Sequence, residues 1–134
     1  MKIFVDTNVL LDVLEQRTVH YDCSSQIWAL AESGKAQVFV SAIGFNNIHY
    51  LVRKHMGYEK AQHAVELLNA TFTMVPLSQE VVNKAIKSRL PDFEDAIQFF
   101  SALSVDADFI VTRNVKDFPQ GTLPVFTPEN FLAQ

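Results

Sequence analysis

Short apolar runs alternate along this chain with longer segments of helical periodicity, and this alternation limits the possible folds more than any other feature. The runs lie at residues 3–5, 38–40, 72–75, 109–111 and 123–126. Between them, apolar residues recur at the spacing of one helix face. Such alternation is typical of a parallel sheet covered by helices. The sequence therefore predicts an α/β fold with a central parallel sheet.

The expected helices begin at residues that cap helices well, and two of them end at glycine. Asp6, Thr7 and Asn8 close the first strand and open a helix, because these residue types are good N-caps. The last apolar run contains Pro124 and is expected at a sheet edge, where proline is tolerated. Helices are expected after Asp6, around 24–33, from Ser41 to Gly57, at about 59–69, from Ser78 towards Arg89, from 91 onwards and after Thr127.

Length and composition indicate one folded domain over residues 1–134. The chain is 49% hydrophobic and only 19% charged, which is too apolar for a disordered chain. Its one cysteine, Cys23, cannot form an internal disulfide or supply a cluster of zinc-binding thiolates. No apolar stretch reaches the length of a secretory signal or a membrane span. The expectation is a soluble, cytoplasmic protein.

The charge balance argues against a protein held to nucleic acid by a large basic surface. Eleven basic and fifteen acidic residues give a formal charge of −4. Two short basic clusters, at 53–55 and at 84–89, are interpreted as solvated cations that complement helix C-termini. Four aromatic residues at helical spacing are interpreted as packing rather than as base-stacking groups: Phe45, Tyr50, Phe99 and Phe100. Nucleic acid remains open as a substrate.

Acidic and polar residues follow the predicted strands where ligands gather in open parallel sheets, outside the carboxyl ends of the strands. Asp6 follows the first strand, and Asp117 comes shortly after the fourth. Asp92 and Asp95 open a helix and are three residues apart, so they are expected to share a helix face, with Glu94 pointing elsewhere. The residues directly after the fourth strand are Thr112, Arg113 and Asn114.

Carboxylates that converge on one spot repel each other, and a divalent cation relieves the conflict. Mg²⁺ and Mn²⁺ prefer hard oxygen ligands and retain bound waters. Such ions activate water and stabilise charge in phosphodiester hydrolysis. Two simpler interpretations stay open: Asp6 as only the N-cap of its helix, and Asp92 as only the cap of the later one. Metal ligation is thus one of two roles for each of these acids.

Three motifs, in order, resemble those of PIN domains. They are Phe4-Val5-Asp6-Thr7-Asn8-Val9-Leu10-Leu11-Asp12, Asp92-Phe93-Glu94-Asp95-Ala96-Ile97-Gln98, and Ile110-Val111-Thr112-Arg113-Asn114-Val115-Lys116-Asp117-Phe118. The likeness spans nearly the whole chain. It implies a three-layer α/β/α sandwich and Mg²⁺- or Mn²⁺-dependent ribonuclease activity. It also implies a homodimer and, as in many small bacterial members, a VapC-type toxin paired with an antitoxin.

The resemblance assigns roles to individual residues. Asp6, Asp95 and Asp117 match catalytic, metal-binding acids, and Asp92 is an additional metal candidate. Asn47 stands where such proteins usually carry a second acid, and its neutral amide cannot accept a proton as a carboxylate does. Arg113 is the candidate for contact with the RNA backbone. The residues expected to support the acids are Thr7, Asn8, Asn47, Thr112 and Asn114.

Three functions are compatible with these residues. The first is a metal-dependent endoribonuclease that hydrolyses RNA, as the toxin of a toxin–antitoxin pair. The alternative is a PIN-fold RNA-binding or regulatory module with weak or no nuclease activity, because Asn47 replaces the usual acid. A third, an aspartate-dependent phosphohydrolase built on Asp6, lacks the second aspartate two positions on.

Overall fold

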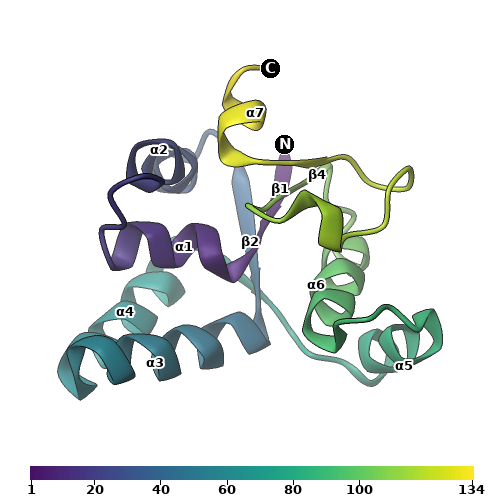
Figure 1. Ribbon diagram of the computed structural model, residues 1–134, viewed down its shortest axis with the longest axis horizontal. Coiled ribbons are helices and arrows are strands. Elements are labelled where there is room, and N and C mark those ends of the chain that lie inside the picture. Colours follow the sequence, from purple (N-terminus) through teal and green to yellow (C-terminus); the bar gives the residue numbers. More distant parts are fainter.

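Five parallel strands form the central sheet of the computed structural model, which describes residues 1–134 (Figure 1). Their order across the sheet is β3-β2-β1-β4-β5, so the first strand lies in the middle. Ile3 on β1 pairs with Val38 on one side and Phe109 on the other. The strands are β1 (Lys2–Val5), β2 (Gln37–Ser41), β3 (Thr73–Val75), β4 (Phe109–Val111) and β5 (Val125–Phe126).

Seven α-helices cover the two faces of this sheet. Figure 1 shows α1 to α4 on one side of the strands and α5 and α6 on the other. The helices are α1 (Thr7–Leu14), α2 (Tyr21–Glu32), α3 (Ala42–Met56), α4 (Tyr58–Thr71), α5 (Gln79–Ser88), α6 (Phe93–Ser104) and α7 (Pro128–Leu132), with a short 3₁₀ helix, η1 (Val115–Asp117). The three-layer α/β/α sandwich expected from the sequence is confirmed.

The pleat of β1 divides the core into two apolar layers. Ile3 and Val5 pack with α1 to α4 in a cluster of 18 buried residues. Phe4, between them, packs on the opposite face with Phe99 of α6 in a cluster of nine. Successive side chains of a strand point to opposite faces, so both faces of β1 are buried and all three positions are apolar. Each such side chain stabilises the fold by about 1.5–3 kcal/mol.

Most of the expected boundaries agree with the structure to within one or two residues. Asp6, Ser41, Ser78, Asp92 and Thr127 are the N-caps of α1, α3, α5, α6 and α7, and each accepts a backbone hydrogen bond. The second helix starts earlier than expected, at Tyr21. The edge strand is confirmed, although β5 contains only the residues after Pro124. None of the helices combines the length and apolarity that crossing a bilayer requires.

One packing expectation is wrong. Phe45, Phe99 and Phe100 contact the core clusters as expected, but the side chain of Tyr50 is 63% exposed. On α3 the buried positions are instead Ile48 and Val52. Since these are four residues apart, they define the inner face of the helix, and Tyr50 falls outside it.

Candidate functional site

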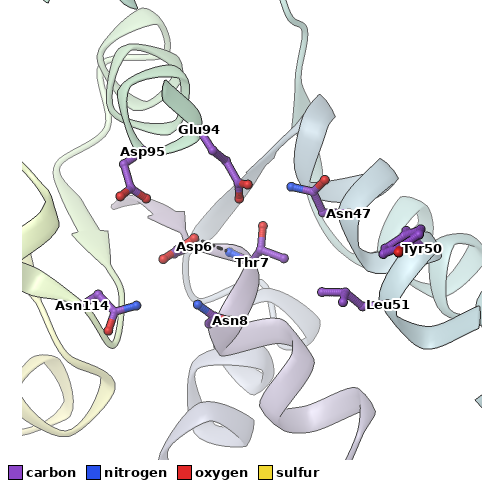
Figure 2. A pocket seen from close by; sticks show the side chains of 9 residues that line it. All are labelled: Asp6, Thr7, Asn8, Asn47, Tyr50, Leu51, Glu94, Asp95 and Asn114. Carbon is purple, nitrogen blue, oxygen red and sulfur yellow. Dashed lines mark hydrogen bonds between the residues drawn. The ribbon is translucent and has the colours of Figure 1, made fainter. Parts of the chain in front are cut away.

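A polar pocket of about 290 Å³ opens at the carboxyl ends of β1, β2 and β4. Four parts of the chain supply its wall: the start of α1, the middle of α3, the first turn of α6 and the loop after β4 (Figure 2). This is where ligands collect in open parallel sheets. The lining residues are Asp6, Thr7, Asn8, Asn47, Tyr50, Leu51, Glu94, Asp95 and Asn114.

Asp6 is the most firmly held acid of the pocket. Its side chain is 5% exposed, and Oδ1 accepts hydrogen bonds from the backbone N–H of Thr7 at 2.7 Å and from Gln98 Nε2 at 2.8 Å. The hydroxyl of Thr112 donates to Oδ2 at 2.8 Å. Burial nevertheless raises the pKa of Asp6, because desolvation outweighs these donors and the nearby positive charge of Arg113. The carboxylate is fixed in position, and a cation would stabilise its charged form.

Gln98 links this acid to the next strand, and the sequence interpretation did not include it among the site residues. Its amide is 1% exposed, and Nε2 donates to both Asp6 and, at 3.3 Å, Thr7 Oγ1. The hydroxyl of Ser41, at the end of β2, donates to Gln98 Oε1 at 3.3 Å. A glutamine within the otherwise apolar stretch 96–100 was the available signal, because buried polar groups need partners.

Asp95 lies between two hollows. It lines the main pocket and also an adjoining one of about 210 Å³, whose other acids are Asp92 and Asp117. Burial, followed by the negative charges of Asp92, Asp6, Asp117 and Glu94, raises the pKa of Asp95 to about 7. The structure thus brings Asp6 and Asp95 together, with Asp92 and Asp117 on the far side of Asp95. Asp92 also caps α6, since Oδ1 accepts from the N–H of Asp95 at 3.0 Å.

Glu94 corrects the expectation that it points elsewhere. Figure 2 shows its carboxylate directed into the pocket, towards Asp6 and the amide of Asn47. Burial and the charges of Asp6 and Asp92 raise the pKa of Glu94, and a hydrogen bond from Asn47 opposes the rise. Gln98, which bonds Asp6, lies four residues after Glu94 and three after Asp95, so both acids share its side of α6 and both reach the pocket.

Asn47 occupies the α3 wall of the same pocket, opposite Glu94 (Figure 2). The position expected to carry a second acid therefore offers an amide. An acid reaches the same part of the pocket from α6 instead. The element that provides this carboxylate therefore differs from the expectation.

The other supporting residues divide into two groups. Thr7 and Thr112 bond Asp6, and Thr112 Oγ1 also accepts from the N–H of Asn114 at 3.1 Å. Asn8 and Asn114 line the pocket without a hydrogen bond to Asp6. The expected hydrogen-bond support for Asp6 therefore comes from Thr7 and not from Asn8.

Arg113 is engaged within the protein and is not among the residues that line the pocket. Its Nε lies 3.2 Å from Oδ2 of Asp12, an acid of α1 that is completely buried. Arg17 Nη1 lies 3.5 Å from the other oxygen of Asp12, and the hydroxyl of Ser24 donates to Oδ2 at 3.0 Å. The contact of Arg113 with an RNA backbone stays a prediction.

The donor set of the pocket fits a hard divalent cation that keeps part of its water shell. Its acids, Asp6, Glu94 and Asp95, offer only oxygen, the donor that Mg²⁺ and Mn²⁺ prefer. No three acidic, histidine or cysteine side chains are close enough together to form a complete ligand set. Mg²⁺ is commonly bound by one or two carboxylates and several waters, which an open pocket of this size can hold.

Known proteins resemble this chain over nearly its whole length. Ribonuclease VapC1 of Aquifex aeolicus (strain VF5) is 26% identical over 135 residues, which cover 97% of this chain and 92% of that protein. A toxin–antitoxin complex from Klebsiella pneumoniae contains a chain of 25% identity and TM-score 0.71, covering 94% of this chain and 97% of that one. A DNA-bound VapBC from Salmonella typhimurium gives 15% identity and TM-score 0.73, covering 96% and 98%.

The family model described as the PIN domain matches residues 2–116. This range contains the first two sequence motifs, all but the last two residues of the third, and every acid of the two hollows except Asp117. The chain belongs to the PIN domain family.

Proposed function

We propose that this protein is a divalent-metal-dependent endoribonuclease that acts as the toxin of a toxin–antitoxin pair. One observation carries the proposal: carboxylates from the end of β1 and the start of α6 share one solvent-open pocket at the carboxyl edge of the sheet. Acids that share a pocket make each other's ionisation less favourable, and a cation relieves this effect. The rise in the pKa of Asp95, partly caused by its acidic neighbours, reflects that conflict.

The names of the relatives support the choice of substrate and partner. One relative is a ribonuclease, and a similar solved structure is a toxin–antitoxin complex. RNA is therefore the proposed substrate, and an antitoxin protein is the proposed partner. A homodimer and a cytoplasmic location remain predictions from the sequence.

Asp6 and Asp95 would hold the metal, with Glu94 in the same pocket and with Asp117 and Asp92 in the adjoining hollow that Asp95 also lines. A bound Mg²⁺ or Mn²⁺ supplies a water of lowered pKa and neutralises charge that develops on the phosphodiester. Gln98 and Thr112 fix the orientation of Asp6 through its two oxygens. Such partners of a ligand typically change metal affinity or activity 10- to 100-fold when they are removed.

A second candidate function is an RNA-binding or regulatory module with little cleavage activity. The amide of Asn47 in the pocket wall favours it, because an amide supplies neither a negative charge nor a proton acceptor. Glu94 favours the nuclease, because it returns a carboxylate to the same region. The two functions differ in one measurable property, which is cleavage that depends on a divalent metal.

The test is cleavage of mixed RNA with Mg²⁺, with Mn²⁺ and with chelator, for wild type and Asp95→Ala. Glu66→Ala, which removes an exposed acid of α4, is the matched control. We expect cleavage by wild type and by the control only when metal is present. Equal cleavage by Asp95→Ala would contradict the assignment of the site. If none of the three proteins cleaves RNA with either metal, the result favours the binding module.

A further inference from the structure

The outer side of α3 extends from the acidic pocket to a second, basic hollow. Asn47, Tyr50, Leu51 and Lys54 are spaced i, i+3, i+4 and i+7, so they lie on one face of the helix. The first three line the acidic pocket. Tyr50 and Lys54, together with Arg53, line a separate hollow of about 430 Å³. The two hollows therefore share the wall formed by Tyr50.

Tyr50 is an aromatic side chain that the core does not use. It is 63% exposed, while Ile48 and Val52 of the same helix are buried. Tyr58 of α4, in contrast, contacts His49 edge-to-face, with ring centres 5.8 Å apart. Tyr50 takes part in no such ring pair. Its ring is free to stack on a planar group that enters from the pocket.

The two cations beside Tyr50 are not neutralised within the protein. Arg53 and Lys54 are exposed and form no salt bridge, whereas His55, the next residue, lies 2.7 Å from Glu15. The guanidinium of Arg53 lies 5.5 Å from the ring centre of Tyr58, which limits its motion. The helix C-terminus explains why cations are tolerated here. It does not explain an exposed tyrosine between them and a pocket of acids.

We infer that this face of α3 is a binding surface for single-stranded RNA that leads into the acidic pocket. It consists of Tyr50, which stacks on a base, and of Arg53 and Lys54, which contact phosphates. This is the combination of groups that binds single strands without base-specific hydrogen bonds. The inference rests on the proposed RNA substrate.

The cations on α3 reduce the electrostatic repulsion between the acidic pocket and a negatively charged RNA. The pocket acids repel a polyanion, and the net charge of the chain is −4. The rise along the helix from Asn47 to Lys54 is about 10 Å, so the cations are close enough to offset this repulsion locally. The RNA backbone is held on α3 while one phosphate reaches the pocket.

The experiment measures binding rather than cleavage. Fluorescence anisotropy of a short labelled single-stranded RNA of mixed sequence is followed in chelator over a range of salt concentrations. Tyr50→Ala should weaken binding about tenfold, and Tyr50→Phe should retain it, because stacking needs the ring and not the hydroxyl. The double variant Arg53→Gln/Lys54→Gln should reduce the slope of log K against log salt by about 1.4, the value for two phosphate contacts.

Lys84→Gln/Lys87→Gln is the matched control, because it removes the same charge from α5 and leaves α3 intact. We expect it to bind as wild type. An equal loss in this control, or unchanged binding by Tyr50→Ala, would overturn the inference. A lower molar mass of Tyr50→Ala than of wild type in light scattering would also overturn the inference. The α3 face would then be a contact between two copies of the chain, and the lost binding would follow from the lost contact.

These outcomes are separate from those of the nuclease test. If wild type binds RNA through α3 but cleaves nothing with Mg²⁺ or Mn²⁺, the nuclease proposal is wrong and the binding surface stands. If wild type cleaves with metal but shows no measurable binding in chelator, the binding surface is wrong and the nuclease proposal stands.

Discussion

Asp6 and Asp12 are buried acids six residues apart, and they differ in the groups that surround their carboxylates. Asp12 lies between two arginines and a serine hydroxyl, and its charge is neutralised within the protein. Asp6 receives hydrogen bonds from neutral groups only, and burial raises its pKa. The environment of Asp12 is that of a structural ion pair. The environment of Asp6, with a raised pKa and no cationic hydrogen-bond donor, is typical of a functional site.

Removing the charge of Asp6 tests this comparison most severely. Asp6→Asn keeps the shape of the side chain, so the fold should survive while divalent-dependent RNA cleavage falls to background. The measurement is the initial cleavage rate with Mn²⁺, together with a urea midpoint that confirms folding. Cleavage at the wild-type rate would mean that Asp6 is only a helix cap.

The converse change is Asp12→Ala. It leaves Arg113 and Arg17 without their shared partner, and breaking a buried pair on one side should destabilise the fold by about 3–5 kcal/mol. Urea denaturation measures the free energy of unfolding. A loss of less than about 1 kcal/mol would show that the two acids differ less than their partners suggest.

Glu94 and Asn47 sharpen the comparison within the pocket. Glu94→Gln should weaken Mn²⁺ binding about tenfold, since the loss of one partner at a metal site has effects of this size. Asn47→Glu should raise Mn²⁺ affinity or turnover, and the double variant should recover affinity lost by Glu94→Gln. Calorimetric titration with Mn²⁺ checks each protein. No response to Asn47→Glu would place Asn47 outside the site.

The smallest effect concerns pH. The pKa of Asp95 rises from 3.8 to about 7 on folding, so the folded state binds more protons between these values. Stability without metal should therefore fall as the pH rises through this window, by about 1 kcal/mol after the partial exposure of Asp95 is taken into account. Urea midpoints at about pH 5 and about pH 8 measure it. Asp95→Asn should flatten the decline, and an unchanged decline would assign it to other groups.

Local patterns in the sequence were sufficient for most of the fold. Apolar runs marked the strands, and the polar caps at Asp6, Ser41 and Asp92 marked where strand gave way to helix or where a helix began. These features depend on neighbours in the chain, which a sequence displays directly. The strand order and the earlier start of α2 depend on packing between distant segments and were not predicted.

The site was predicted only in part, for a related reason. Asp6 and Asp95 follow from their places after a strand and at the start of a helix. The hydrogen bond between Gln98 and Asp6 joins residues 92 positions apart, and no local pattern indicates it. Glu94 was misplaced because helical spacing relates residues to each other but does not orient a helix in the fold. Tyr50 was misassigned because apolar character alone does not distinguish the inner face from the outer.

The hydroxyl of Ser41 takes part in two interactions at once. It accepts the N–H of Gly44 as the cap of α3 and donates to Gln98, whose amide holds Asp6. The cap of α3 and the orientation of Asp6 therefore depend on one hydroxyl, through a single intervening amide. Loss of that hydroxyl would affect the start of a helix and the position of an acid on the neighbouring strand together.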